Sequence, residues 1–101
     1  GEGKEALGQI IAYGEAEVAP PLFPIAPAAA IPKALEAAGL QVGDIARWEV
    51  NEAFAAVAIA NQRLLNLPAD RLNADGGAVA LGHPVGSSGC RLVVSLLHGL
   101  K

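Results

Sequence analysis

The chain has 101 residues, which suffices for one small domain with a single hydrophobic core. Its formal net charge is -3, and its seven Lys and Arg residues are scattered along the sequence rather than clustered. A protein that binds nucleic acid or an anionic membrane carries a basic patch, so neither partner is expected. No apolar run approaches the roughly 20 residues that a membrane-spanning helix needs. The function classes that remain are small-molecule chemistry and protein contact.

Apolar residues make up 52% of the chain but aromatic residues only 4%, so Ala, Val, Leu and Ile must fill the interior. This composition favours helices that pack closely on a sheet. Because a small domain leaves much of its surface exposed, part of the apolar excess should contact a companion domain or subunit. The chain opens on Gly1 and contains no methionine, so we expect a piece of a longer protein. Its single cysteine, Cys90, fits a reducing compartment such as the cytoplasm or the mitochondrial matrix.

The first half of the chain predicts a strand and a helix. Residues 7–18 mix apolar and polar side chains with partial alternation, and the two prolines that follow cannot donate to a ladder. We expect a strand there, bent at Gly14. The apolar spacing of residues 31–40 is helical, with Pro32 in the first turn and Gly39 as a left-handed C-terminal cap.

The second half continues the alternation. Residues 44–50 form a short apolar run that predicts a strand, and a helix should begin after Asn51 and end near Leu67. This helix is apolar nearly all round from 54 to 60, so it should be largely buried. Residues 73–86 form a glycine-rich loop around a short apolar run, and 87–100 carry a helical stripe with Ser87 or Ser88 at the N-cap. The order β-α-β-α-β-α predicts a layered α/β fold over residues 1–101, as a single partial domain.

His83 is the most informative polar residue, because it lies in a segment with five glycines, residues 76–89, just before a predicted helix N-terminus. Unpaired N–H groups at such a terminus attract negative charge. Gly82 and Gly86 would allow backbone conformations or close approaches that a side chain blocks, and Pro84 stiffens the backbone. Taken alone, His83 could also be a loop residue with a satisfied hydrogen bond. A phosphate-binding P-loop is disfavoured because its Lys-Ser/Thr ending is missing.

Asn51 and Glu52 stand where a predicted strand enters a buried helix, which is the usual place for ligand groups in open α/β sheets. An amide there can position a water molecule, and a carboxylate can orient or cap. The alternative is that Asn51 merely caps the helix.

Cys90 and His98 invite a metal site together with His83, but one thiol and two imidazoles at these spacings match no zinc pattern. Cys90 falls in the first turn of a helix, where a thiol can be activated. The plainer interpretation is a small, packed thiol.

Four segments, residues 51–54, 73–77, 82–86 and 88–91, resemble the thiolase family in order and spacing. The resemblance extends back to Leu7, and residues 23–27 and 48–52 look most like acetoacetyl-CoA thiolases of mitochondrial type. It implies the thiolase fold, in which two similar β-α-β-α-β-α-β-β halves pack through helices. This chain would hold most of the second half, with the last two strands missing after Lys101.

The resemblance also implies a reaction, the reversible thiolysis of acetoacetyl-CoA to two acetyl-CoA through an acyl-cysteine intermediate. His83 would assist activation of a cysteine from the missing N-terminal half, and Asn51 would hold a water that completes the oxyanion site. Around the substrate it implies that Ala53 and Phe54 lie along the pantetheine channel, that Phe23 bounds the acyl pocket and that Gly82 contacts substrate. No cofactor is required; some members bind potassium, for which the backbone of Val79 is a candidate. The whole protein would be a homo-oligomer, dimeric or tetrameric.

Two departures from the family pattern matter. Neither the nucleophilic cysteine nor the second cysteine, in a Cys-Gly-Gly-Gly-like run, has a counterpart here, and Cys90 matches neither. We therefore expect the chain alone to be inactive. Two alternatives stay open: a thiolase-like module that binds acyl-CoA or pairs subunits without catalysis, and a decarboxylating ketoacyl synthase. The second is less favoured, since Asn51 stands where such enzymes tend to use another histidine.

Overall fold

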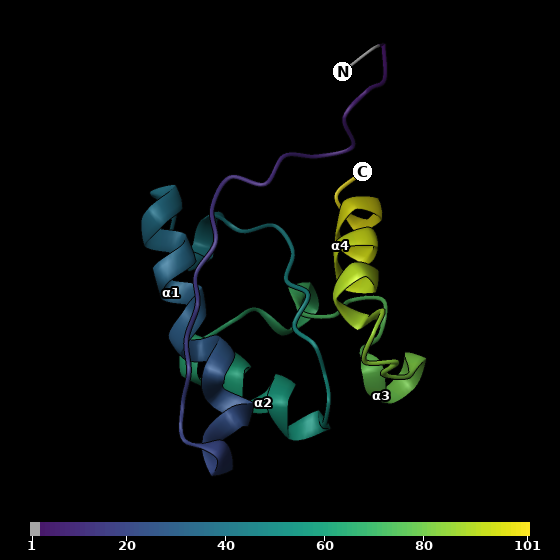
Figure 1. Ribbon diagram of the computed structural model, residues 1–101. Helices are drawn as coiled ribbons and strands as arrows, with labels where there is room; N and C mark the ends of the chain where they lie inside the picture. Colours follow the sequence, from purple (N-terminus) through teal and green to yellow (C-terminus); the bar gives the residue numbers. More distant parts are fainter. Residues whose placement is uncertain (1–2) are drawn as a thin grey trace.

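The computed structural model describes residues 3–101, so Gly1 and Glu2 of the predicted domain lie outside the described residues. Four α-helices and three short 3-10 turns are joined by extended segments (Figure 1). The helices are α1 (Ala26–Ala38), α2 (Ala55–Leu65), α3 (Ala78–Leu81) and α4 (Ser88–Gly99), and the turns are η1 (Pro20–Ile25), η2 (Val42–Asp44) and η3 (Ala69–Arg71). No helix in this part of the chain is long and apolar enough to span a bilayer.

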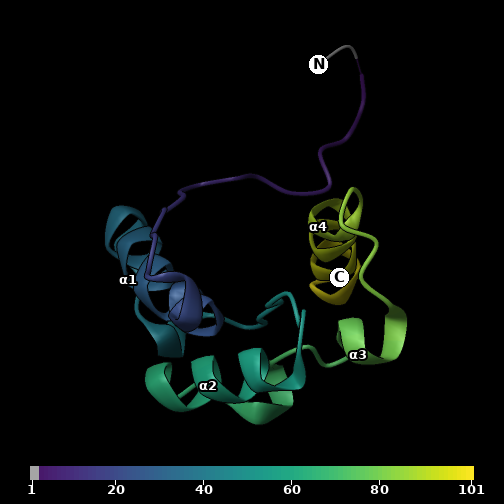
Figure 2. The same cartoon turned by 60° about the horizontal axis from the view of Figure 1, so that its bottom comes forward.

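The segment that follows η2 runs through the middle of the molecule, and the helices lie around it. Figure 2 shows α1, α2 and α4 on three sides, with the N-terminal segment passing from α4 across to α1. Helix α2 packs on η1 and on α1. The buried apolar residues lie on or beside α2, α3 and the middle segment: Trp48, Val50, Val57, Leu67 and Ala78. The core therefore sits beneath the segment that ends at Asn51.

Helix α1 begins earlier than predicted. The sequence predicts a start at Ile31 with Pro32 in the first turn, but Pro27 occupies that turn and Pro32 lies in the helix interior. A proline in the first turn costs no hydrogen bond, and Pro27 satisfies this preference before Pro32 is reached. The predicted C-terminal cap is confirmed, because Gly39 has φ 70° and ψ 30°.

Helix α2 is less buried than predicted. Its only buried residues are Val57 and Asn61, whereas Ile59 and Leu64 are 47% and 60% exposed. Asn61 is fully buried, and its Nδ2 donates to the carbonyl oxygens of Pro24 and Val57, both at 2.7 Å. The hydrophobic pattern could not reveal that a polar residue would lie at the centre of the contact with η1.

The predicted strands are not formed as ladders within residues 3–101. The parallel bridge between Trp48 and Leu72 is isolated, and the run predicted as a third strand is the short helix α3. Residues 11–18 are nevertheless extended, and their exposure alternates with the two-residue period of a strand. The alternation follows from side-chain chemistry, but a ladder also needs a neighbouring backbone. No backbone hydrogen bond joins residues 7–18 to residues 44–50.

The N-terminal segment touches two helices at glycines. A Cβ on Gly8 would lie 2.5 Å from Leu97 Cδ2 of α4, and one on Gly14 would lie 2.6 Å from the Ala30 carbonyl oxygen of α1. The bend predicted at Gly14 lies at Leu7 instead. Gly14 therefore serves close approach to α1 rather than bending.

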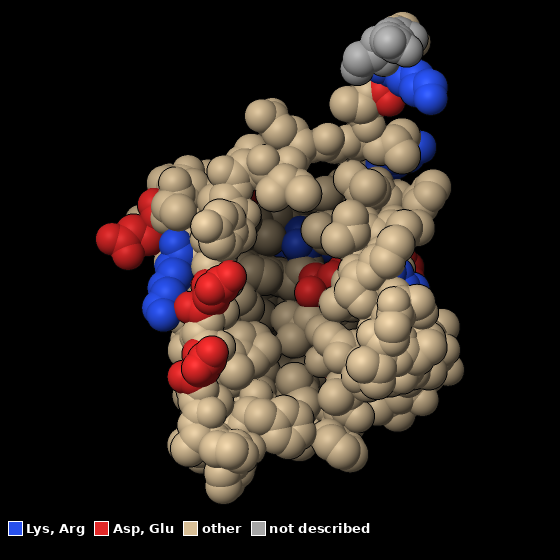
Figure 3. All heavy atoms as spheres, in the orientation of Figure 1, with Lys and Arg blue, Asp and Glu red and all other residues tan. Residues whose placement is uncertain are grey.

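Uncharged atoms dominate the surface in Figure 3, which is hollowed between the sides formed by α1 and α4, with charged atoms at the bottom of the hollow. Several large apolar side chains are exposed, among them Ile10 at 89% and Tyr13 at 80%. This exposure agrees with the apolar excess of the composition.

Replacing Gly14 by alanine should destabilise the fold, because the new methyl group would press on the α1 backbone. We expect Gly14→Ala to lower the free energy of unfolding by about 2 kcal/mol, as overpacking does elsewhere. Chemical denaturation of the intact protein measures it. Gly43→Ala is the matched control, since a Cβ there meets nothing within 4 Å. Equal stability of the two variants would contradict the close contact.

Candidate active site

Asn73 fixes the position of the segment that carries Asn51. The Trp48 backbone pairs with Arg71 O at 2.7 Å and with Asn73 N at 2.9 Å. One step further along, the Asn73 side chain replaces a backbone neighbour: its Oδ1 accepts from Val50 N and its Nδ2 donates to Val50 O, both at 2.9 Å. Asn73 has φ 46°, a left-handed conformation that Asn tolerates well. The bridge is thereby extended by a side chain up to the residue before Asn51.

Asn51 faces His83, as the resemblance of their two segments to thiolases implied. The Asn51 Nδ2 and the His83 Nε2 lie 3.4 Å apart. The alternative of Asn51 as a helix cap is wrong, because the N-cap of α2 is Phe54, three residues later. Asn51 Oδ1 is buried and has no hydrogen-bond partner among residues 3–101. The amide is therefore available for work other than capping.

Gly82 turns the chain from α3 toward His83. Its φ of 93° and ψ of 161° lie in a region that essentially only glycine adopts. The prediction that Gly82 allows a backbone conformation that a side chain would block is confirmed. The same prediction for Gly86 is wrong: its φ is not in the left-handed region, and a Cβ there would meet nothing within 4 Å. His83 itself is exposed, and its Nδ1 lies 2.6 Å from Ser88 Oγ.

Glu52 links the segment that carries Asn51 to the start of α3. Its Oε1 accepts from the Val79 N–H, in the first turn of α3, at 3.1 Å. The carboxylate therefore caps the first turn of α3 and not α2, the helix that follows it in the sequence. Gly77 leaves room for it, since a Cβ there would lie 2.6 Å from Glu52 Oε1.

The two phenylalanines of the predicted substrate region lie together. The Phe23 and Phe54 rings form an edge-to-face pair with centroids 6.1 Å apart and an interplanar angle of 61°. Phe54 is 63% exposed and Phe23 48%, while Ala53 is half-buried. Because Asn51 and Phe54 are three residues apart, this aromatic pair is within about 11 Å of the Asn51 backbone along the chain.

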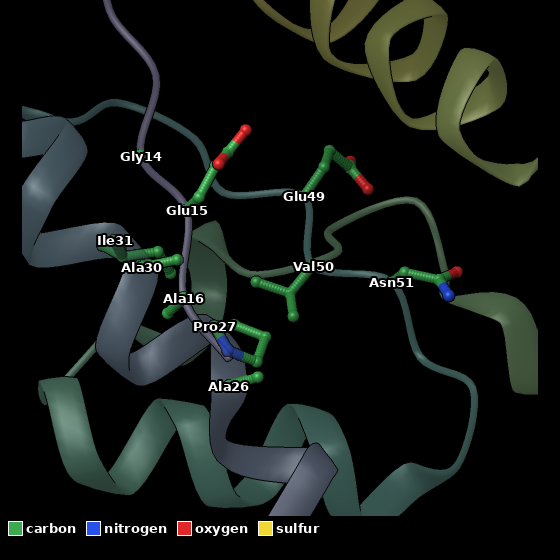
Figure 4. Close-up of a pocket in the computed structure, with 10 residues that line it drawn as sticks. All are labelled: Gly14, Glu15, Ala16, Ala26, Pro27, Ala30, Ile31, Glu49, Val50 and Asn51. Carbon is green, nitrogen blue, oxygen red and sulfur yellow. The ribbon is translucent and has the colours of Figure 1, made fainter. Parts of the chain in front are cut away.

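A cluster of charged side chains around Arg47 was not predicted from the sequence. Arg47 forms ion pairs with Asp75 and, at 3.6 Å from Nε to Oε1, with Glu49, whose side chain is only 3% exposed. The two-residue spacing of Arg47 and Glu49 could have indicated a shared face of an extended segment. In Figure 4, Glu49, Val50 and Asn51 line a groove of about 480 Å³ opposite the N-terminal segment and α1. Of the residues predicted for the site, only Asn51 borders this groove.

Cys90 and the metal alternative can be placed as well. Cys90 is exposed, so the interpretation as a packed thiol is wrong. Within residues 3–101, no three His, Cys, Asp or Glu side chains gather as metal ligands. The Val79 amide is engaged by Glu52, which leaves its carbonyl oxygen as the group that could contact a cation.

The arrangement can transfer a proton and stabilise an oxyanion. With the Asn51 amide as donor, the His83 Nε2 is an acceptor and can take a proton from an acidic group nearby. Once protonated, the same nitrogen becomes a donor beside the amide. Two neighbouring donors of this kind can stabilise an oxygen that becomes negative during a reaction.

The Asn73 amide is predicted to stabilise this arrangement measurably. Asn73→Gly tolerates the left-handed conformation but leaves the N–H and C=O of buried Val50 unpaired, so the free energy of unfolding should fall by about 2 kcal/mol. Asn66→Gly is the control, because Asn66 has φ 55° at the end of α2 and is exposed. It should change stability by less than about 0.5 kcal/mol. Urea titrations compare the two variants, and losses of equal size would refute the bridging role.

Comparison with known proteins agrees with the geometry. A family model described as "Thiolase, C-terminal domain" matches residues 4–101. The mitochondrial acetyl-CoA acetyltransferase of Danio rerio is 55% identical over 94% of this chain and 23% of that protein. A probable acetyl-CoA acetyltransferase of Dictyostelium discoideum is 54% identical over 98% of this chain and 24% of that protein.

Two solved thiolases share the fold. The human mitochondrial 3-ketoacyl-CoA thiolase superposes with a TM-score of 0.92 at 43% identity, covering 95% of this chain and 24% of that one. The peroxisomal 3-ketoacyl-CoA thiolase of Saccharomyces cerevisiae gives 0.87 at 47% identity, covering 90% and 26%. The chain thus spans about a quarter of the length of the relatives that it matches. With the family model covering residues 4–101 and the fold shared, the chain belongs to the thiolase family, in its C-terminal domain.

Proposed function

We propose that this chain supplies the histidine and asparagine of an acetyl-CoA C-acetyltransferase, which cleaves acetoacetyl-CoA reversibly into two acetyl-CoA. The observation that carries the proposal is the approach of Asn51 Nδ2 to His83 Nε2, 3.4 Å, from segments 32 residues apart. The similarity to acetyl-CoA acetyltransferases at 54–55% identity supports the choice of substrate.

The proposed reaction needs a nucleophilic cysteine from the rest of the protein. Its thiol loses a proton to His83 Nε2, and the thiolate attacks the 3-keto carbon of acetoacetyl-CoA. The bond between C2 and C3 then breaks, which leaves an acetyl-cysteine thioester and the enolate of acetyl-CoA. The enolate takes a proton from a second acid, the second cysteine of the family pattern. The second cysteine then recovers its proton from the thiol of free CoA, and the CoA thiolate attacks the acetyl-cysteine to give acetyl-CoA. Protonated His83 returns its proton to the departing cysteine thiolate, which restores the thiol.

His83 and Asn51 would stabilise the oxygen that becomes negative during this reaction. The departing acetyl unit is carbanion-like, so its thioester oxygen carries charge as the carbon–carbon bond breaks. Protonated His83 and a water held by the free Oδ1 and N–H groups of Asn51 would surround that oxygen. The buried Oδ1 without a partner among residues 3–101 is an acceptor suited to such a water.

The substrate would lie along the aromatic pair. Phe23 and Phe54 present exposed ring edges and faces beside the segment of Asn51, and Ala53 adds a small apolar contact. A backbone as open as that of Gly82 lets an acyl thioester approach His83 closely. We therefore propose that Phe23 bounds the acyl pocket and that Ala53, Phe54 and Gly82 contact the pantetheine arm and thioester.

The surroundings of the site follow from the same proposal. In the whole protein, residues 7–18 and 44–50 would become strands of a layered α/β half once two further strands pair with their open backbones. Acetyl-CoA and acetoacetyl-CoA, the N-terminal half and further copies in a homo-oligomer are the proposed partners. The mitochondrial relatives favour the mitochondrial matrix as the compartment.

Potassium is a separate proposal that rests on Val79. A potassium site is built from several oxygen ligands, often carbonyls. The Val79 carbonyl offers one, in a four-residue helix that is too short to pair all of its carbonyls internally. One carbonyl does not complete a site, so no step of the proposed reaction depends on the ion.

Replacing His83 tests the proposed function. In the full-length protein, His83→Ala should lower kcat for acetoacetyl-CoA thiolysis roughly 100- to 10,000-fold, with a much smaller change in KM, because its role lies in the transition state. His98→Ala is the control, since His98 is the other histidine and lies exposed in the last turn of α4. Steady-state kinetics of the two variants measure kcat and KM. Proportional losses in kcat and CoA affinity, or normal turnover without His83, would refute the role.

Cys90 should be dispensable for the covalent step. We expect Cys90→Ala to keep near-normal kcat and to form the acetyl-enzyme, because the thiol is exposed on α4 and matches neither cysteine of the family pattern. Mass spectrometry after incubation with acetoacetyl-CoA locates the acetyl group. Acetylation of Cys90 together with loss of turnover in the variant would make it the nucleophile and overturn the assignment.

A further inference from the structure

The side of His83 that faces away from Asn51 is occupied by Ser88. The Ser88 Oγ lies 2.6 Å from His83 Nδ1 and 3.2 Å from the Pro84 carbonyl oxygen. Ser88 is only 4% exposed, although His83 itself is exposed. A buried hydroxyl therefore holds the inner nitrogen of an accessible imidazole.

The hydrogen bonds on the two sides of the ring agree on one tautomer. A neutral imidazole has one N–H and one acceptor nitrogen. The Asn51 Nδ2 can only donate, so a hydrogen bond to His83 Nε2 requires the lone pair at that nitrogen. The ring proton must then be on Nδ1, where Ser88 Oγ can accept it. The hydroxyl proton of Ser88 remains free to go to the Pro84 carbonyl, which can only accept.

We propose that Ser88 is a positioning residue that holds His83 as the Nδ1-protonated tautomer, with the Nε2 lone pair on the side of Asn51. This inference rests on the proposed function, because it is the proton transfer at Nε2 that needs this tautomer. The opposite tautomer would offer an N–H where a base is required. A base whose second nitrogen is oriented by a third group is a recurring arrangement in nucleophilic catalysis.

The same hydrogen bond also serves the protonated ring. When Nε2 takes a proton, both ring nitrogens donate, and Ser88 Oγ continues to accept from Nδ1 without any rearrangement. Donors that are already in place when charge develops require no reorganisation during the reaction. Ser88 thus supports His83 first as a base and then as an oxyanion donor.

Ser87 provides a matched control within the same turn. It precedes Ser88, is exposed, and its Oγ also points to the Pro84 carbonyl, at 3.4 Å. Unlike Ser88, Ser87 makes no side-chain hydrogen bond with His83, and it occupies the N-cap position of α4 without a side-chain cap bond. A purely structural role of the serine pair would affect Ser87 and Ser88 variants alike.

The experiment compares three variants of the full-length protein, namely Ser88→Ala, Ser88→Thr and Ser87→Ala. Ser88→Ala should lower kcat for acetoacetyl-CoA thiolysis roughly 10- to 100-fold, with KM changed less than about 3-fold, since misplacing a catalytic group affects the chemical step. Ser88→Thr keeps the hydroxyl and should recover most of the loss. Ser87→Ala should match the wild type. Thermal unfolding of each variant shows whether it is folded.

The tautomer is read directly by NMR of protein labelled with ¹⁵N and ¹³C in histidine. Wild-type His83 should show a protonated Nδ1 and an unprotonated Nε2 at neutral pH, and Ser88→Ala should lose this preference. The inference is overturned by a wild-type ring protonated at Nε2, as it would be with the Asn51 amide turned to present Oδ1. It is also overturned by folded Ser88→Ala with normal kcat, or by equal losses in the Ala and Thr variants.

Failure of the proposed function looks different. If wild-type protein does not cleave acetoacetyl-CoA, or if His83→Ala retains full turnover, the reaction assigned to the site is wrong. The Ser88 proposal fails by itself when the wild type is active and His83→Ala is impaired, yet Ser88→Ala changes neither kcat nor the tautomer of His83.

Discussion

The paired hydrogen bonds between the Asn73 amide and the backbone of Val50 are the constraint on which the site depends. They do the work of one rung of a sheet, but they use a side chain, so the segment of Asn51 is aligned where no strand partner is present among residues 3–101. The backbone hydrogen bonds of Trp48 hold the segment at one point, and the two hydrogen bonds of the Asn73 side chain hold it at Val50, the residue before Asn51. The direction in which Asn51 emerges is set by these few bonds.

The position of His83 relative to Asn51 is fixed by several local contacts. Glu52 fastens the start of α3, Gly82 reverses the backbone after it, and Ser88 holds the imidazole from within. None of these contacts is strong alone. Because they act in series over few residues, the relative position of Asn51 and His83 depends on hydrogen bonds and backbone conformation more than on a large hydrophobic core.

The sequence predicted the helices and the site better than the sheet. Helical periodicity and the Gly39 cap depend on neighbours in the chain, so they could be recognised locally. A ladder depends on a partner far away in sequence, which explains why residues 11–18 alternate in exposure like a strand without pairing. The pairing of Asn51 with His83 was implied by the resemblance to thiolases, and the structure brings the two residues together.

What escaped the sequence was the role of polar residues in buried places. Asn61 at the η1 contact, Glu49 beside Arg47, and Ser88 behind His83 all bond to groups that only the folded chain brings near. The sequence offers Ser87 or Ser88 as the N-cap of α4; Ser87 occupies that position, and the Ser88 hydroxyl turns to the imidazole. A side chain that can satisfy either a backbone or a side-chain partner cannot be assigned from its position in the sequence.

The N-terminal segment, with Ile10 and Tyr13 open to solvent, has a consequence for how the chain can be handled. An extended backbone with unsatisfied donors and acceptors and apolar side chains is a template for pairing with any other extended chain. Produced by itself, the chain would be prone to self-association through this edge. Any segment that covers this edge in the whole protein therefore also protects it from pairing with other extended chains.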